Sequence, residues 1–593
     1  GNIIVDELSS NNLALKIDIN GQTVDELKGM MYVEANHLDI TPWLDSVLAI
    51  DDDKTKADIG FSAWFKVQQG AIERLQIALH DNLITWQDNS QINTQVNKLT
   101  HSLTLSSGQL LLVKGKEPAS FKLYSTPMLL QYDQQDVQEM IVQMNKTAED
   151  FSVYLSSFGL ALISQVSPLF IASENTRELL SNLDMNGQVN DLYFKKTAND
   201  IQALASFSNT STKYSQGIPG IDNLAGTLSL TQQNLHIDFA AEQGALDFNH
   251  HFIAPILYQS LAAKVDLSFS DNSWQLFVND IALNSDELNL QGDLVIDSPK
   301  DSPMTMSLLA NILDGDASKA GHYYPLTTMS TDLVNYLNDA LVDGKIKQAQ
   351  VLVNGPLANF PFADNSGIFV VNAELEDATF KFSHDWPAIE KFSANLNFTN
   401  NSMLITGRSG ELVGLDVSGV QAAIDDLGVG QTLTVDTLIK PSPATHVASL
   451  MEQSPLKNSV GSVLQQLQIG GDIEGEFHLN LPLNAAEKVV ASGLINFANN
   501  SVALQTPRMN FEQVNGQLAF ENDKISTKNL SLNWQNLPLT LKINGNDKSD
   551  YFDTHIVLNA DWKKEHWQPH VSADLQKYLD GQLKWQGDLS LYQ

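Results

Sequence analysis

The residue groups in this sequence that could bind a metal are each incomplete. The neighbouring histidines His250 and His251 have no H-E-x-x-H partner, and the chain contains no cysteine that could complete a zinc site. The acidic run Asp51–Asp53 lacks the alternating oxygen ligands of a calcium loop. We therefore expect no metal site and no cofactor.

Two glycine-containing segments also fall short of the motifs that they approach. Gly407–Gly410 reads GRSG and lacks the second spacer residue of a nucleophile elbow. Gly470, Gly471 and Gly475 do not have the spacing of a dinucleotide fingerprint. Scattered carboxylates leave a glycosidase pair open, but no spacing points to one. We predict that the chain is not an enzyme and has no catalytic residues.

The charge balance excludes further classes of function. The chain has 35 basic and 70 acidic residues, a formal net charge of -35. Nucleic-acid binding rests on Lys and Arg that neutralise phosphates, so we expect no nucleic acid as a partner. Apolar residues make up 43% and charged residues only 18%. This composition fits half-buried strands better than a disordered chain.

The segment from Phe511 to Gly545 shows the element that such a chain must be built from. Apolar and polar residues alternate in three runs, which the turn-like END and the pair Leu537–Pro538 separate. Side chains of a strand point alternately to its two faces. The pattern therefore predicts a meander of three strands with one apolar face.

A related spacing, with apolar or small residues at i, i+3, i+5, i+7 and i+9, recurs along the chain. In four of five copies the middle residue is Gly or Ala. A small residue there favours a sharply bent sheet, or room on its concave side. The copies are Val96-Leu99-His101-Leu103-Leu105, Ile221-Leu224-Gly226-Leu228-Leu230, Tyr258-Leu261-Ala263-Val265-Leu267, Ile389-Phe392-Ala394-Leu396-Phe398 and Phe511-Val514-Gly516-Leu518-Phe520.

Three helical insertions are expected between the strands. The first, over about 134–183, includes the uncharged run Phe151–Ala172, in which Pro168 should break or kink the helix. We expect it to pack on the sheet or across an open edge; contact with lipid and a membrane span are the alternatives. The second covers Ser330–Val342, and the third lies within His446–Gln468, interrupted at Pro455.

The most specific features of the chain lie between Tyr323 and Gly410. They are Tyr324-Pro325, a helix that ends at Gly344, Gly355-Pro356-Leu357, Phe360-Pro361-Phe362, Gly367 and Trp386-Pro387-Ala388-Ile389. In these features the chain resembles the AsmA-like family of bacterial envelope proteins, relatives in kind of TamB. The likeness covers most of the chain and is least specific in residues 1–130.

This resemblance implies a bridge-like lipid transfer protein of the periplasm. Phospholipids would be its cargo, moving between the inner and outer membranes. The family's N-terminal anchor in the inner membrane is not in this sequence, and neither is a C-terminal part that could contact the outer membrane. The resemblance brings no catalytic residues.

We therefore predict a mainly β fold: a long, twisted, curved antiparallel sheet that forms an elongated open groove, with a few short amphipathic helices inserted. The expected segments form one continuous, elongated structure, an internal fragment of a longer protein. They are a β segment (1–130), a helical insertion (131–185), a β-groove segment (186–325), a short helix (326–345), a β-groove segment (346–440), a helical insertion (441–469) and a β-groove segment (470–593).

The apolar faces of the strands supply the predicted site. We expect these side chains to line a groove that shields acyl chains: Leu228, Leu230, Val265, Leu267, Phe269, Leu396, Phe398, Val514, Leu518 and Phe520.

Two other classes of function remain as alternatives. One is an envelope assembly scaffold that acts on β-rich clients by strand addition, and the other is a carbohydrate-binding β protein.

Overall fold

The computed structural model consists of two compact units. Unit 1 comprises Gly1–His250, Ala254–Asp286 and Gly292–Ser302, and unit 2 comprises His251–Ile253, Glu287–Gln291 and Pro303–Gln593. Strand β21 (Leu288–Ser298) contains residues of both. The described residues are 4–5, 8–9, 12–44, 55–88, 91–92, 95–96, 99–117, 119–270, 272–427, 432–461, 464–465, 467–483, 488–505, 508–522, 524–548 and 551–592.

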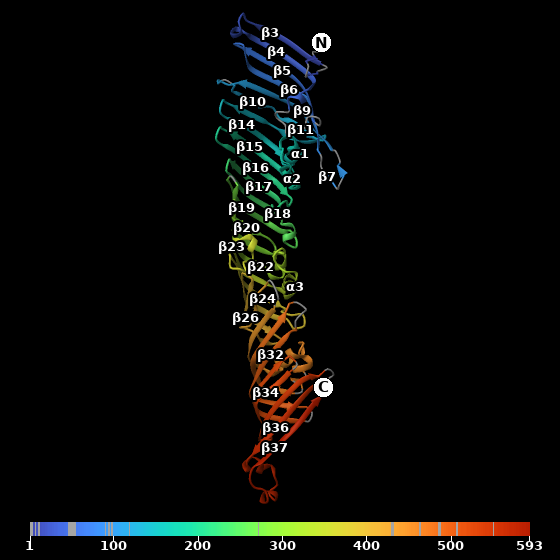
Figure 1. The fold of residues 1–593 in the computed structure, drawn as a ribbon, viewed down its shortest axis with the longest axis vertical. Coiled ribbons are helices and arrows are strands. Elements are labelled where there is room, and N and C mark those ends of the chain that lie inside the picture. Colours follow the sequence, from blue (N-terminus) through green and yellow to red (C-terminus); the bar gives the residue numbers. More distant parts are fainter. Residues whose placement is uncertain are drawn as a thin grey trace. The chain divides into compact units, whose positions relative to one another are not determined.

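In unit 1 the main strands pair antiparallel in chain order (Figure 1), except that β10 pairs with β9 and β13, while β11 and β12 form a hairpin beside them. Strand β9 pairs with β10 through one half and with β11 through the other, because the chain bends between these two short strands. The strands are β3 (Asn12–Asn20), β4 (Lys28–Asp39), β5 (Lys56–Gln68), β6 (Ala71–Asp88), β9 (Leu99–Lys114), β10 (Phe121–Ser125), β11 (Met128–Tyr132), β12 (Gln135–Met140), β13 (Val142–Lys146), β14 (Phe151–Gly159), β15 (Asn186–Lys196), β16 (Ile201–Thr212), β17 (Gly220–Thr231), β18 (Asn234–Asp247), β19 (Ile256–Ser270) and β20 (Ser273–Asn284).

Unit 2 repeats this arrangement with antiparallel pairs between successive strands. The short β30 is an addition that pairs with β32. The strands are β22 (Thr305–Asp316), β23 (Leu341–Pro356), β24 (Ile368–Phe380), β25 (Ile389–Thr399), β26 (Ser402–Leu412), β27 (Leu415–Asp416), β28 (Gln421–Ile424), β29 (Thr432–Pro443), β30 (Leu467–Gly470), β31 (Asp472–Pro482), β32 (Val490–Leu504), β33 (Met509–Glu521), β34 (Lys524–Trp534), β35 (Leu537–Lys548), β36 (Tyr551–Trp562) and β37 (Leu583–Tyr592).

The predicted mainly β class and antiparallel pairing are confirmed. The meander predicted for 511–545 is the hairpin series β33, β34 and β35. In β31 the alternation is strict from Asp472 to Asn480, since every second residue is buried and the residues between are exposed. The period of two in the sequence therefore marks which side chains share a face.

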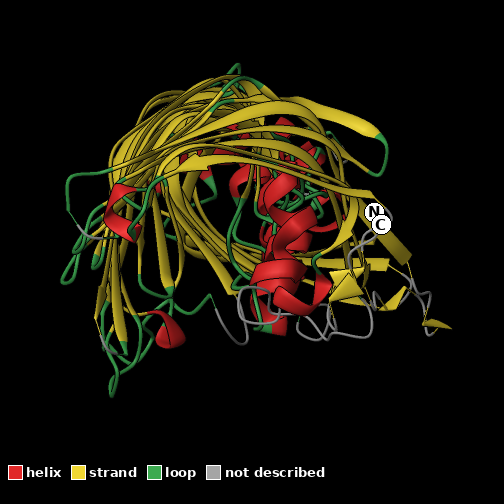
Figure 2. Cartoon of the chain, turned by 90° about the horizontal axis from the view of Figure 1, so that it is seen from above, coloured by secondary structure: helices red, strands yellow, loops and turns green. Residues whose placement is uncertain are grey.

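The recurring spacing has a structural cause that the sequence analysis did not identify. Its first step, from i to i+3, is a β-bulge with a residue of positive φ at i+2 in three of the copies: Asn223 (φ 56°), Lys391 (φ 50°) and Gln513 (φ 55°). A bulge inserts an extra residue and bends its strand. Figure 2 shows the strands as strongly bent ribbons.

The small middle residue, where it is a glycine, lies opposite aromatic side chains of the neighbouring strands. Gly226 lies opposite Phe207 and Phe239, and Gly516 lies opposite Phe497. A Cβ atom on Gly226 would come within 2.1 Å of the Asp238 carbonyl oxygen. The small residues thus make room for cross-strand rings and neighbouring backbone, while the bulges bend the strands.

The helices are shorter than predicted in the first insertion. Residues 135–159 form β12, β13 and β14, and only α1 (Ala161–Phe170) and α2 (Glu174–Asn182) are helical. The predicted helix is wrong over these strands because its uncharged run concealed the alternation of β14. Pro168 does not end α1; the Ser164 carbonyl, which Pro168 cannot bond, accepts the Ser167 hydroxyl at 2.8 Å.

The other predicted helices are present, but the second ends at Ala340 and not at Gly344, because Leu341 already begins β23. Helix α3 (Thr331–Ala340) is capped by the Ser330 side chain, and α4 (Ala444–Glu452) precedes a π-helical turn at Lys457–Gly461, so Pro455 does interrupt the third insertion. A short α6 (Lys564–Trp567) lies between β36 and β37. No helix within the described ranges is long and apolar enough to cross a membrane.

The α-helices of each unit occur at one end of its strands. In an antiparallel meander, successive connections alternate between two rims of the sheet. One rim carries α1 and α2 in unit 1, in the connection 159–186, and α3, α4 and α6 in unit 2, in the connections 316–341, 443–472 and 562–583. We call it the helix rim. We call the other the hairpin rim. Its connections include 114–121, 146–151 and 196–201 in unit 1.

Candidate functional site

An unbroken apolar row crosses the sheet of unit 1. Each member is the direct register partner of the next, so all lie on one face, which we call the apolar face. At about 4.8 Å per strand the row extends for roughly 60 Å. The row runs Ile17, Met31, Phe65, Leu75, Leu112, Leu123, Met144, Val153, Phe194, Ala203, Leu230, Leu235, Leu267 and Leu276.

The structure brings the predicted residues of unit 1 together on this face. Leu230 and Leu267 belong to the row. Leu228 and Val265 both pair with Ile237, and these three residues form a parallel row next to the first on the same face. All four predicted residues are half-buried. Phe269 pairs with Trp274 near the hairpin rim and is 42% exposed. These side chains retain surface that a ligand could cover.

The predicted residues of unit 2 lie in a closed environment. Val514, Leu518 and Phe520 are 1%, 1% and 6% exposed and belong to a buried cluster that extends from Ala317 to Trp567. Leu396 and Phe398 are half-buried against the same cluster. Val514 and Leu518 also line a small cavity of about 30 Å³. In unit 2 we use the term apolar face for the side of the strands that carries this cluster, and protein, rather than open space, covers most of it in this conformation.

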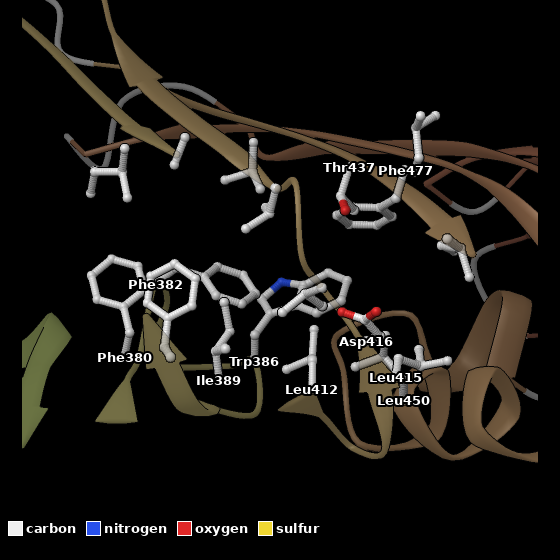
Figure 3. A pocket seen from close by; sticks show the side chains of 18 of the residues that line it. Phe380, Phe382, Trp386, Ile389, Leu412, Leu415, Asp416, Thr437, Leu450 and Phe477 are labelled. Carbon is white, nitrogen blue, oxygen red and sulfur yellow. The ribbon is translucent and has the colours of Figure 1, made fainter. Parts of the chain in front are cut away.

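A second cavity lies where the helix rim of unit 2 meets the apolar face (Figure 3). Its volume is about 50 Å³, and apart from Asp416 and Thr437 its lining is apolar. Trp386, from the connection between β24 and β25, meets Phe477 of β31 edge to face with ring centroids 5.4 Å apart. Leu450 and Met451 of α4 close the cavity from another side. The space is enough for a few water molecules and not for an acyl chain.

One strongly perturbed carboxylate borders this cavity. Hydrogen bonds from Ser418 and then from the Lys440 ammonium lower the pKa of Asp416 to about 2. The Lys440 Nζ atom lies 2.9 Å from a carboxylate oxygen of Asp416. The carboxylate is therefore ionised at neutral pH, and its partners hold it at the surface end of the cavity, so we assign it a structural role.

The incomplete motifs do not assemble into sites. His251 contacts the Thr327 hydroxyl, and His250 packs edge to face with Tyr214. Gly407–Gly410 lies inside β26 rather than at a strand-to-helix turn. Within the described residues no three His, Asp or Glu side chains form a group that could hold a metal ion. Asp51–Asp53 lie outside the described residues.

Sequence reasoning missed the part of the apolar row in residues 12–160. The signal was present in β3 and β6, where Ile17 and Leu75 each lie between two polar residues. It was concealed in β9, where Leu110–Val113 is apolar on both faces. The role of Trp386 was also missed, because a residue in a connection carries no period that would place it over a face.

Comparison with known proteins adds an independent observation. Residues 1–593 match the family model described as YhdP protein. The chain is 25% identical over 580 residues to a protein of Escherichia coli (strain K12) named "Intermembrane phospholipid transporter YhdP". This alignment covers 95% of the chain and 45% of the relative, so the chain spans less than half the length of that protein.

Proposed function

Because the chain belongs to the YhdP family, we propose that it is a segment of a bridge-like phospholipid transporter. Its apolar face would shield acyl chains while phospholipid moves between two membranes. The observation that carries this proposal is the in-register apolar row of unit 1, whose members are mostly half-buried. The relative's name supplies the class of cargo.

The energetics of lipid movement explain why a continuous row is needed. Exposing acyl chains to water costs about 0.8 kcal/mol per CH₂ group, or about 20–25 kcal/mol for two long chains. A row of apolar side chains at intervals of about 4.8 Å replaces water along the whole path. Head groups stay in water, so transport requires no catalytic residue.

We further propose that the chain works in the cell envelope, in the periplasm. A part of the protein outside this sequence would attach it to the inner membrane, and another would contact the outer membrane. The relative's description as an intermembrane transporter supports this location.

The proposal predicts that lipid contacts one face of β17 only. Photo-crosslinkers at Leu230 and, separately, at the adjacent Ser229 would be tested in the purified protein mixed with vesicles of phosphatidylethanolamine and phosphatidylglycerol. We expect mass spectrometry to find phospholipid on the Leu230 variant and not on the Ser229 variant. Equal labelling would contradict the proposal, and crosslinks to protein alone would favour the assembly scaffold.

A buried charge should interrupt the track. Leu230→Asp places a carboxylate in the apolar row, where an unpaired charge is costly, so we expect lipid transfer between donor and acceptor vesicles to fall at least 10-fold. The control Ser229→Asp adds the same charge on the polar face and should leave the transfer rate within two-fold. A fall of the same size in both variants would argue against the assignment of the faces.

A further inference from the structure

Three strands of unit 1 end at the hairpin rim in a lysine on the apolar face. Lys114, Lys146 and Lys196 are the last residues of β9, β13 and β15. They share the apolar face because they follow Leu112, Met144 and Phe194 of the apolar row by two residues. We call these three residues the lysine lip.

Register places the lysines in one row with apolar residues between them. Phe121 pairs with both Lys114 and Lys146, and Phe151 pairs with both Lys146 and Lys196. The lysines are exposed, whereas the two phenylalanines are half-buried. Cationic groups therefore recur on every second strand, about 10 Å apart.

Two of the lysines are set by the same turn. The sequences Lys-Thr-Ala-Glu-Asp (146–150) and Lys-Thr-Ala-Asn-Asp (196–200) each close a hairpin. In both turns the Thr hydroxyl accepts the Asp backbone N–H, at 2.9 Å for Thr147 and 3.0 Å for Thr197. Each hairpin thus holds its lysine at the same position on the rim.

The carboxylates near the lip, which include Glu117 and Glu149 in the turns, do not pair with its lysines, and three of them have other partners. Asp150 pairs with Lys195 at 3.5 Å, and Asp200 accepts a hydrogen bond from Gln202 at 2.9 Å. Glu73, which follows in register beyond Lys114, pairs with Lys66 at 2.6 Å. Within the described part of the chain, no carboxylate forms an ion pair with a lysine of the lip. In a protein of net charge -35, these cations border an apolar surface without an internal partner.

We infer that the lysine lip binds the phosphate groups of phospholipids whose acyl chains lie on the apolar row. This inference rests on the proposed function and deepens it by naming the rim along which head groups are held. An ammonium group is a compact donor that suits phosphate, and one Lys near an anionic lipid surface contributes about 1 kcal/mol. The alternating phenylalanines would cover the first carbons of the chains.

The test removes the charges and keeps the apolar stems. The triple variant Lys114→Gln, Lys146→Gln, Lys196→Gln carries a photo-crosslinker at Met144, within the apolar row. The control variant Lys16→Gln, Lys28→Gln, Lys122→Gln loses the same charge from the polar face, at lysines that hold no carboxylate near the lip, and carries the same crosslinker. Circular dichroism establishes that both variants are folded like the parent. The probes are vesicle-borne phosphatidylglycerol, vesicle-borne diacylglycerol, which lacks phosphate, and inorganic phosphate.

We expect the lip variant to capture about 10-fold less phosphatidylglycerol than the parent and the control variant. In high salt, the difference in capture between the parent and the lip variant should shrink. Capture of diacylglycerol should be equal in all three proteins. Equal capture of phosphatidylglycerol by all three would overturn the lip and leave the lipid track intact. No lipid capture by the parent would overturn the proposed function itself. Saturable binding of inorganic phosphate in the absence of lipid capture would assign the lysines to free phosphate and overturn the inference.

Discussion

At the scale of single residues, the two units use the same kind of side chain differently. Leu230 in unit 1 keeps part of its surface accessible, whereas Leu518 in unit 2 is 1% exposed. Both are leucines in bent strands next to small residues. The difference lies in what faces them, because Leu518 borders a small cavity that Leu467, Ile469 and Phe497 also line.

Trp386 lines the larger cavity of unit 2, next to the apolar face. Trp386→Ala would remove a side chain that is 4% exposed and contacts Phe382 and Phe477. A large-to-small change at such a buried site lowers the free energy of unfolding by about 3–5 kcal/mol. Urea denaturation of unit 2, followed by tryptophan fluorescence, would measure this loss. The control Leu404→Ala, at a side chain that is 41% exposed, should cost less than about 1 kcal/mol. Equal losses would show that the ring does not organise the closed face.

Asp416 predicts an acid dependence of stability. Its folded-state pKa of about 2 lies below the ordinary value of 3.8, because Ser418 and Lys440 favour the ionised form. The contribution of ionised Asp416 to the free energy of unfolding is therefore present above about pH 4 and is lost as the pH falls toward 2. Asp416→Asn should flatten this part of the curve when the free energy of unfolding is measured from pH 5 to pH 2. The exposed control Asp301→Asn should keep the parent's slope, and an unchanged slope for Asp416→Asn would contradict the assignment.

At the scale of elements, the bulges decide where each strand bends. They lie near the helix rim in both units, for example at Asn223 and Gln243 in unit 1 and at Lys391 and Asn499 in unit 2. Residues with an L side chain adopt positive φ at a cost of about 1–2 kcal/mol, and Gly avoids that cost. Bends at corresponding places in neighbouring strands give the sheet a consistent curvature.

Lys391 allows this role to be tested on an exposed residue. Lys391→Gly should raise the free energy of unfolding by up to about 1 kcal/mol, because its φ of 50° suits Gly, and the exposed ion pair with Glu411 contributes little. Lys391→Val should lower it by about 1–2 kcal/mol, since a β-branched residue resists positive φ. Thermal unfolding followed by circular dichroism measures both. The opposite order of the two variants would show that the bulge is not maintained.

At the scale of the whole molecule, the two units should differ in local stability. Most members of the apolar row of unit 1 are half-buried, whereas unit 2 contains the large buried cluster from Ala317 to Trp567. Backbone hydrogen bonds next to a buried core open less often than those next to an accessible face. We therefore expect slower hydrogen exchange in β31 to β36 than in β15 to β20, measured by mass spectrometry of peptic peptides. Equal protection would indicate that lipid-free unit 1 closes on itself in solution.

Much of this architecture could be predicted from local patterns. Alternation in the sequence identified the meander β33 to β35, and the capped, amphipathic pattern identified α3, because strand and helix periods are visible over a few residues. Alternation also placed Leu228, Leu230, Val265 and Leu267 on one face. The pattern failed in β14, where an uncharged run resembled a helix, and in β9, where both faces are apolar.

By itself, the sequence determined the strands, the composition of their two faces and the exclusion of known catalytic motifs, because these properties depend on residue types and short spacings. Only the tertiary structure decided which face stays accessible and which is closed by the buried cluster of unit 2. It also decided that Lys114, Lys146 and Lys196 share one rim. Burial and cross-strand register depend on residues that are distant in the chain, and no local period records which of them will meet.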